Sequence, residues 1–288
     1  MIKWQGPYAS GLLQHLETMW SAYDAIVFFT YLYPTTYYGV GAVKDRHRVF
    51  IYPTVHDEAH AYLPIWRKYT NYNLLFLTEE ERLISREIWG NSRGIVVGYG
   101  LRETRCATHD AHQSAEPYLL YAGRIELAKG VNILLEYFQH YVRDNAQTNI
   151  NLKLIGKLGM DIGSPDRVQY LGFLNEEQKL EQISNASALA IPSPYESLSI
   201  VALEAFMLGT PILVNKHCSV LNGHVSRSRA GLAYANYTEF EQGMRLLTNG
   251  ETFRANMGSL GKAYFAQNYS WETYTKRVYE SLFGGSEG

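Results

Sequence analysis

The sequence has little cysteine, little net charge and no long apolar run, and each shortage excludes a class of protein. Among its 288 residues, Cys106 and Cys218 are the two cysteines, too few for a disulfide framework, which indicates a reducing, cytoplasmic compartment. The formal net charge of −2 gives no sign of a surface that wraps nucleic acid. The most apolar run, AIVFFTYLY from Ala25, is far below the roughly 20 residues of a membrane-spanning helix. The opening MIKWQGPYASG also lacks the apolar core and cleavage site of a signal peptide.

Several motifs of catalysis and metal binding are missing as well. The sequence contains no GxxxxGK[ST] phosphate loop and no serine on a nucleophile elbow. His109, His112 and His224 do not form a metal-ligand spacing with either cysteine, and a solvated loop is favoured over chelation by the first two. These patterns therefore give no candidate metal site and no nucleophilic serine.

What the sequence does contain is an alternation of short apolar runs and helical patterns, which is typical of parallel sheets covered by helices. In the first part the apolar runs are AIVFFT, RVFIYP, NLLFL and GIVVG, and helical spacing appears in EAHAYLPIWRKY and EEERLISREIW. In the second part the segments are YLLYAG, VNILLEYFQHYV, NLKLIG, VQYLGFL, EEQKLEQISN, ALAIPS and PILVN, followed by helices through Phe240, Phe253 and Tyr274. The prediction is an α/β protein with two unequal doubly wound, Rossmann-like domains and a ligand beyond the carboxyl ends of the strands.

A polar stretch without periodicity, LRETRCATHDAHQSAEP, marks the boundary between the two parts. We place a shortened first domain and its linker at residues 1–116, a second domain at 117–270, and a C-terminal helix at 271–288 that can pack back on the first domain. The first domain has only about four strands, and a small sheet exposes an edge. We therefore expect self-association, a partner chain, or an incompletely formed binding side in the first domain.

The stretch SPYESLSIVALEAFMLGTP, residues 193–211, predicts a turn, a helix and a stop after the buried strand ALAIPS. Ser197 or Ser199 can cap this helix. Gly209 fits the left-handed position that ends helices, and Pro211 prevents continuation. The start of the helix would then face the ligand crevice with unpaired backbone N–H groups and a partial positive charge, which favour a phosphate.

Two carboxylates flank this helix start. Glu196 stands in the turn, and Glu204 follows roughly 7 Å deeper along the helix axis. A glutamate near a helix is usually solvated, and each of the two, taken alone, favours that interpretation. The segment from Ser197 to Lys216 holds no other charge, however, so the helix is covered on most sides and the Glu204 carboxylate needs a partner. We infer that the two carboxylates bracket a diphosphate, as the hexose and the ribose do in a sugar nucleotide.

Several segments of the second half also match the pattern of one family, in order. An E-x7-E pattern follows a buried strand and continues as E-A-x-x-x-G-x-P, and YAGRIELAKGVNILLEYF precedes it. NLKLIGK and VQYLGFLNEEQKLEQISNASALAIPS lie between them. From about Tyr118 to Tyr269 the chain thus resembles the retaining glycosyltransferases of the GT-B fold, specifically glycosyltransferase family 4 (group 1). The resemblance implies two Rossmann-like domains, a nucleotide-sugar donor such as a UDP- or GDP-hexose, and a hydroxyl-bearing acceptor.

The resemblance also gives each matching position a role. Glu196 would meet hydroxyls of the transferred sugar, and Glu204 would bind the ribose hydroxyls. Arg124 and Lys129, which follow Gly123, would hold the donor diphosphate and stabilise the departing nucleotide, although a pair of surface cations is the alternative. Backbone groups would complete the donor site, at the base from Gly172 and Phe173, and at the diphosphate and sugar from Ser197, Leu198, Ser199 and Ile200. The family often has glycine where Ser199 stands, so the loop differs slightly here.

The first half resembles the family less completely. PTVHDEAH, residues 53–60, looks like the cleft segment in which a histidine reaches the transferred sugar, and His56 is the candidate. A turn histidine bonded to Asp57 or Glu58 is nearly as good an interpretation. Family members usually carry another strand and a glycine-rich loop ahead of this point. We therefore expect either a shortened first domain or a chain that is part of a longer or a split product.

The mechanism that the resemblance implies is metal-independent transfer of a hexose with retention of configuration. The acceptor would be a glycan, a lipid or a small molecule, and a peripheral membrane contact is compatible with a lipid. Glu196 as a double-displacement nucleophile stays an alternative. Two other functions also stay open: a sugar-nucleotide epimerase of the same fold, and a sugar-nucleotide-binding subunit that needs a partner chain.

Overall fold

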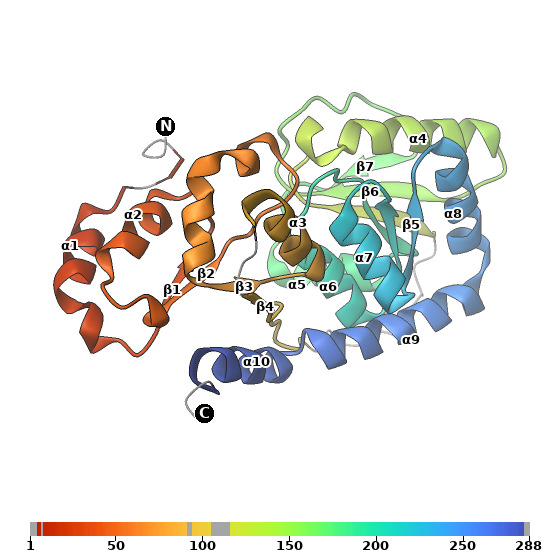
Figure 1. Cartoon of the computed structure of the whole chain (residues 1–288). Coiled ribbons are helices and arrows are strands. Elements are labelled where there is room, and N and C mark those ends of the chain that lie inside the picture. Colours follow the sequence, from red (N-terminus) through yellow and green to blue (C-terminus); the bar gives the residue numbers. More distant parts are fainter. Residues whose placement is uncertain (1–4, 7, 91–93, 105–115, 285–288) are drawn as a thin grey trace. The chain divides into compact units, whose positions relative to one another are not determined.

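The computed structural model describes residues 5–6, 8–90, 94–104 and 116–284, and the chain divides into two compact units (Figure 1). Unit 1 comprises residues 1–99 and 274–288, and unit 2 comprises residues 100–273. Each unit has its own parallel sheet and its own buried core. The expected α/β class with two Rossmann-like domains is therefore confirmed.

Unit 1 is built on a four-stranded sheet whose strands pair in chain order, β1-β2-β3-β4, all in parallel. The strands are β1 (Ile26–Phe29), β2 (Val49–Tyr52), β3 (Asn73–Phe76) and β4 (Gly94–Val96). The helices are α1 (Ser10–Met19), η2 (Trp20–Ala22), α2 (Pro34–Ala42), η3 (Arg46–Arg48), η4 (Ala59–Tyr62), η5 (Pro64–Asn71), α3 (Glu79–Trp89) and most of α10 (Trp271–Phe283). The four strands are the four apolar runs that the sequence predicts.

Aromatic side chains dominate the core of unit 1. Tyr31 lies edge-on to the ring of Trp66, and the rings of Trp66 and Tyr69 stack. Buried rings with polar groups need hydrogen-bond partners. Trp66 donates its Nε1–H to the carbonyl of His60 at 2.7 Å, and Tyr69 donates its hydroxyl to the carbonyl of Tyr31 at 2.9 Å. These bonds tie the segment between β2 and β3 to the core.

That segment corrects one prediction. EAHAYLPIWRKY has helical spacing, but it forms two short 3₁₀ helices, η4 and η5, in place of one α-helix. The cause is Pro64, whose ring restricts the preceding residue to extended backbone. Leu63 accordingly has φ −68° and ψ 130°, which breaks the helix between the two pieces.

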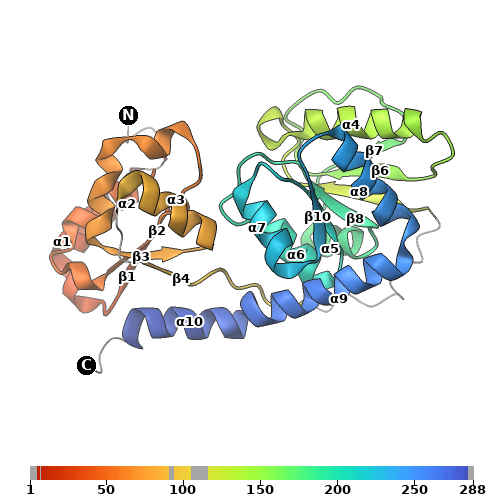
Figure 2. The ribbon, with the colours of Figure 1, turned by 45° about the vertical axis from the view of Figure 1, so that its right-hand side comes forward.

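Unit 2 is built on a six-stranded parallel sheet in the order β10-β9-β8-β5-β6-β7 (Figure 2). The strands are β5 (Tyr118–Ala122), β6 (Asn151–Ile155), β7 (Val168–Tyr170), β8 (Ala188–Ile191), β9 (Ile212–Asn215) and β10 (Gly231–Tyr234). Strand order reverses between β5 and β8, since β6 lies on one side of β5 and β8 on the other. In open parallel sheets this switch point is where ligands bind.

Helices cover both faces of this sheet. The helices of unit 2 are η6 (Leu127–Lys129), α4 (Val131–Asp144), α5 (Glu176–Ser184), α6 (Ile200–Leu208), α7 (Ser219–Ser228), α8 (Tyr237–Asn249) and α9 (Glu251–Asn268). On one face Phe138 of α4 and Phe240 of α8 pack with Leu119 and Leu152 of the strands. The alternate strand residues, such as the buried Leu120, face the other way. There α5, α6 and α7 contact the sheet and α9 packs on α6.

The elements that the sequence patterns miss include α2, α7 and β10. α7 is rich in serine and histidine and has only a weak apolar stripe, SVLNGHVSRS. β10, with the sequence GLAY, is only four residues long and pairs in parallel with β9. Short elements of this kind are fixed by tertiary contacts more than by their own pattern. In the part of the chain that the structure describes, no helix has the length and apolar character to cross a membrane.

Candidate functional site

Two adjoining pockets open at the carboxyl ends of β5, β6 and β8 in unit 2. The larger measures about 370 Å³ and the smaller about 180 Å³. They share a wall made by Ala122, Gly123, Arg124, Ile200 and Val201. Because this wall contains the first turn of α6, the two pockets form one crevice that passes across the start of that helix.

The start of α6 differs from the prediction in one respect. Ser199 occupies the N-cap position, but it has φ 68° and its hydroxyl makes no capping bond within the described backbone. Ser199 therefore does not act as the predicted cap, and Ser197 lies two residues before the N-cap. The Ala202 N–H already bonds the Ser199 carbonyl at 3.0 Å. The N–H groups of Ile200 and Val201 precede the first intrahelical bonds, and both residues line both pockets. The helix ends as predicted, with Gly209 in the left-handed conformation.

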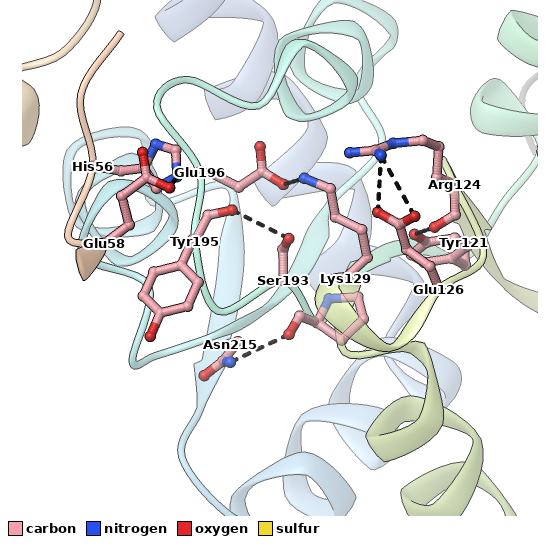
Figure 3. Close-up of polar contacts among 11 residues, drawn as sticks. His56, Glu58, Tyr121, Arg124, Glu126, Lys129, Ser193, Tyr195, Glu196 and Asn215 are labelled. Carbon is pink, nitrogen blue, oxygen red and sulfur yellow. Dashed lines mark hydrogen bonds and ion pairs between the residues drawn. The ribbon is translucent and has the colours of Figure 1, made fainter. Parts of the chain in front are cut away.

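The smaller pocket holds an ion pair between Lys129 and Glu196. Nζ of Lys129 lies 2.8 Å from Oε1 of Glu196, and both side chains are largely shielded from solvent (Figure 3). Gly130 makes this approach possible, because it has φ 71° and a Cβ there would lie 2.5 Å from the carbonyl oxygen of Pro192. The sequence K-G at the end of η6 thus brings the lysine against the loop that follows β8.

Arg124 lies on the wall common to both pockets. Its Nη1 is 3.1 Å from Oε1 of Glu126, and its side chain remains 67% exposed. Tyr121 donates its hydroxyl to the Arg124 carbonyl at 2.6 Å, which fixes the backbone beneath the guanidinium (Figure 3). The exposed guanidinium is available to an anion at the start of α6, since a surface ion pair such as that with Glu126 is weak.

The larger pocket contains the second carboxylate, Glu204. Its side chain is only 7% exposed, and Oε1 is 2.8 Å from Nζ of Lys179 on α5. This confirms that a carboxylate in so apolar a helix needs a partner. Burial raises the pKa of Glu204 above its ordinary value, and Lys179 opposes that rise. The sequence patterns do not single out Lys179. Its position on the helix that follows the Gly172 loop could have indicated that it lies at this pocket.

The floor and rim of the larger pocket come from the ends of β5, β6 and β7. A Cβ on Gly156 would lie 1.9 Å from the carbonyl oxygen of Gly123, so the two strand ends are in backbone contact. Phe173 follows Gly172 at the rim, and its ring is 83% exposed although it lines the pocket. An exposed aromatic ring at the rim of a pocket is suited to stacking on a planar ligand.

A histidine that the sequence analysis sets aside supports this site from behind. His224 on α7 is fully buried, and its Nε2 lies 2.8 Å from the carbonyl oxygen of Leu198. Because a carbonyl oxygen only accepts, Nε2 donates this bond. Its Nδ1 is 3.3 Å from the hydroxyl of Tyr264 on α9. His224 therefore holds the loop immediately before α6, which no spacing in the sequence reveals.

His56 belongs to unit 1, in the turn that follows β2. Its Nε2 lies 3.4 Å from Oε2 of Glu58, the contact expected of a turn histidine. The turn is held by the buried Glu81, which accepts the Val55 N–H at 3.0 Å and the Leu77 N–H at 2.7 Å. Burial raises the pKa of Glu81 to about 8, although these backbone bonds oppose the rise. A role for His56 toward a sugar stays a prediction.

Metal ligands do not gather in the described residues, where no group of three or more His, Cys, Asp and Glu side chains could hold an ion. Cys106, His109 and His112 lie outside those residues. Cys218 is a buried free thiol before α7. Metal independence stays a prediction.

Comparisons with known proteins agree with the fold and with the motifs of unit 2. An uncharacterized glycosyltransferase of Methanocaldococcus jannaschii is 26% identical over 173 residues, which cover 58% of this chain and 44% of the relative. Sucrose-phosphate synthase from Thermosynechococcus elongatus superposes with a TM-score of 0.75 at 17% identity, covering 98% of this chain and 83% of that one. A TarM variant of S. aureus in complex with fondaparinux, α-GlcNAc-glycerol and UDP gives 0.74 at 13% identity, covering 94% and 58%.

The two parallel-sheet units and the crevice at the switch point define a GT-B fold, which the structural neighbours share. A model of the family described as glycosyl transferases group 1 matches residues 108–264, more than half of the chain. The chain belongs to this family. It spans less than half the length of the curated relatives that it matches.

Proposed function

We propose that this chain binds a nucleotide-diphosphate sugar and transfers the hexose, with retention of configuration, to a hydroxyl group of a glycan, a lipid or a small molecule. The observation that carries the proposal is the crevice of unit 2. It passes across the start of α6 and has a lysine-paired carboxylate at each end, Glu196 in one pocket and Glu204 in the other. Within group 1, glycosyltransferase family 4 is the assignment that the E-x7-E motif supports.

The layout of the crevice suggests how a donor would lie. The larger pocket has room for a nucleoside, with Phe173 beside the base and Glu204 beside the ribose. The diphosphate would lie at the first turn of α6, where backbone N–H groups and the helix dipole favour an anion. Arg124 would reach it from the shared wall. The hexose would then fall in the smaller pocket, beside Lys129 and Glu196.

The proposed chemistry requires stabilisation of the departing nucleotide. The bond between the anomeric carbon and the phosphate oxygen breaks, and its electron pair stays on the phosphate. The acceptor oxygen bonds the same face of the sugar, and its proton passes to the departing phosphate. Arg124, Lys129 and the start of α6 would be directed at the oxygens on which negative charge increases. The scheme uses no metal, because these groups supply the positive charge.

Lys129 and Glu196 would have linked roles. They pair with each other at 2.8 Å. A phosphate at the start of α6 would compete for the ammonium group and leave the Glu196 carboxylate to hydroxyls of the sugar. His56 of unit 1 is proposed to reach the same sugar from the first domain.

The test is a panel of nucleotide sugars and nucleoside diphosphates in a thermal-shift assay with chelator present, followed by transfer assays with the donor that binds. We expect one of UDP, GDP or ADP to stabilise the protein, and NMR of the product to show the donor's anomeric configuration. Inversion would contradict retention. A new sugar nucleotide formed without acceptor would favour an epimerase. Absence of any shift would overturn the donor-site assignment.

A further inference from the structure

Lys179 is the least expected charged residue of the larger pocket. It projects from α5 and lies between two carboxylates, with Nζ 2.8 Å from Oε1 of Glu204 and 2.9 Å from Oε2 of Glu176. The two partners differ greatly, because the side chain of Glu176 is 70% exposed and that of Glu204 is 7% exposed. All three residues line the pocket. Solvent therefore screens the ion pair of Lys179 with Glu204 less than its ion pair with Glu176.

The two oxygens of Glu204 are not equivalent. Oε1 accepts from Lys179, whereas Oε2 is buried and has no hydrogen-bond partner among the described residues. A buried carboxylate oxygen without a donor is unfavourable, and a hydroxyl group in the pocket would satisfy it. The structure thus presents one anchored oxygen and one oxygen that is left for a ligand.

The charge on Glu204 depends on its surroundings. Burial favours the neutral acid, the ammonium of Lys179 favours the anion, and the carboxylate of Glu176 on α5 opposes the anion again. Arg124 and Lys157, from the loops after β5 and β6, also line the pocket. Lys179 is the cation in direct contact with Glu204. Its own pKa is raised, because the bonds to Glu204 and Glu176 outweigh the lowering by burial.

We propose that Lys179 is a positioning residue that keeps Glu204 ionised and directs its Oε2 at the ribose, so that recognition of the ribose hydroxyls does not change with pH. The inference rests on the proposed function, since it takes the pocket to hold a nucleoside. An ion pair that only joins α5 to α6 would instead affect stability and leave ribose recognition unchanged.

The readout is the ratio of the affinities for a nucleoside diphosphate and for its 2′-deoxy counterpart, measured by calorimetry from pH 5.5 to 8.5 with chelator. UDP, GDP and ADP are tried first, and the tightest of them is used. Both members of the pair carry the same diphosphate, so its protonation cancels in the ratio. For the wild type we expect a preference for the ribonucleotide of about tenfold, constant across this range.

For K179M we expect a preference close to the wild-type value at pH 8.5 that falls by about fivefold to tenfold toward pH 5.5, as Glu204 takes up a proton and loses its charge-assisted bond. K179R should restore the constant preference, because it restores the cation. E204Q should lack the preference at every pH. K262M, the same substitution at an exposed position on α9 outside the pocket, is the matched control and should behave as the wild type.

The outcomes separate the two proposals. If the wild type binds none of the nucleotides, the proposed function fails and the inference with it. If the wild type prefers ribonucleotides and K179M keeps that preference at all pH values, the inference alone is overturned. The inference is also overturned if K179M only lowers the melting temperature. If K179M does not fold, K179Q takes its place, because it keeps a polar side chain without the charge.

Discussion

Units 1 and 2 each bury a glutamate in the helix that follows a strand, but they satisfy its charge in opposite ways. Glu81 in α3 of unit 1 is 1% exposed and accepts backbone N–H groups through both oxygens, from Val55 and from Leu77. Glu204 in α6 of unit 2 has one oxygen on a lysine and one oxygen without a partner, among the described residues, at a pocket wall. Both oxygens of Glu81 thus have hydrogen bonds to the backbone, whereas one oxygen of Glu204 has none among the described residues.

Under the proposed function, the difference separates a structural carboxylate from one that binds a ligand. Buried polar groups are normally hydrogen-bonded, so an incomplete set requires an explanation. At Glu81 both carboxylate oxygens accept backbone N–H groups, which hold the turn after β2. At Glu204 the missing bond lies in a pocket of about 370 Å³. Burial raises the pKa of both groups, so a perturbed pKa alone does not distinguish them.

The largest expected effect is on the stability of unit 1. Glu81→Ala leaves two buried backbone N–H groups without an acceptor, which should lower the free energy of unfolding by about 3 kcal/mol. Urea denaturation followed by tryptophan fluorescence reports mainly on unit 1, which contains four of the five tryptophans. Glu87→Ala, at an exposed position of the same helix, should have little effect. Equal loss in both variants would show that Glu81 is not structural.

The second effect is stabilisation of unit 2 by a ligand. A nucleoside diphosphate at a hundredfold excess over its Kd should add about 2.7 kcal/mol to the free energy of unfolding. Thermal melts with chelator and with UDP, GDP or ADP measure it. The transition of unit 1 should not move. A shift confined to unit 1 would contradict the placement of the donor in unit 2.

Whereas Glu81→Ala should affect stability, Glu204→Ala should affect ligand binding and leave stability unchanged. It should weaken binding of the nucleoside diphosphate by about 1.5–3 kcal/mol, because a charge-assisted bond to the ribose is lost. It should leave the fold intact, since Lys179 keeps Glu176 as a partner. Calorimetry gives the affinity and circular dichroism the fold. Normal nucleotide binding would assign Glu204 a structural role and remove the distinction between the two carboxylates.

Taken per pH unit, the smallest effect is a pH dependence of unit 1. Glu81 has a pKa of about 8 in the folded protein and an ordinary value of 4.5. Between these pH values the unfolded chain has released the proton that the folded chain still holds. The free energy of unfolding therefore falls as pH rises, by at most about 1.4 kcal/mol per pH unit. It levels off above a pH of about 8. Urea midpoints from tryptophan fluorescence measure it. Glu81→Gln should flatten the profile, and an equally steep profile in that variant would assign the dependence elsewhere.

Sequence patterns anticipate most of the fold because the strands are short, apolar and bounded by turn residues. They also locate Glu196 and Glu204, since two charges in an apolar stretch stand out. They do not reveal Lys179 or His224, because each acts on the site from another helix, α5 or α7, through a tertiary contact. The left-handed backbone of Ser199 escapes them for a related reason. Serine in that position is ordinarily expected to cap, and only the packed loop shows otherwise.

The contact between Gly156 and Gly123 limits how this site can change. Because any side chain at Gly156 would collide with the opposite backbone, this position in the floor of the larger pocket tolerates almost no substitution. Variation has more room at the rim, at exposed positions such as Phe173. Libraries that aim to alter ligand choice should therefore diversify the loop after β7 and leave the two glycines fixed. The larger pocket thus has one side fixed by backbone contact and one side where side chains can change.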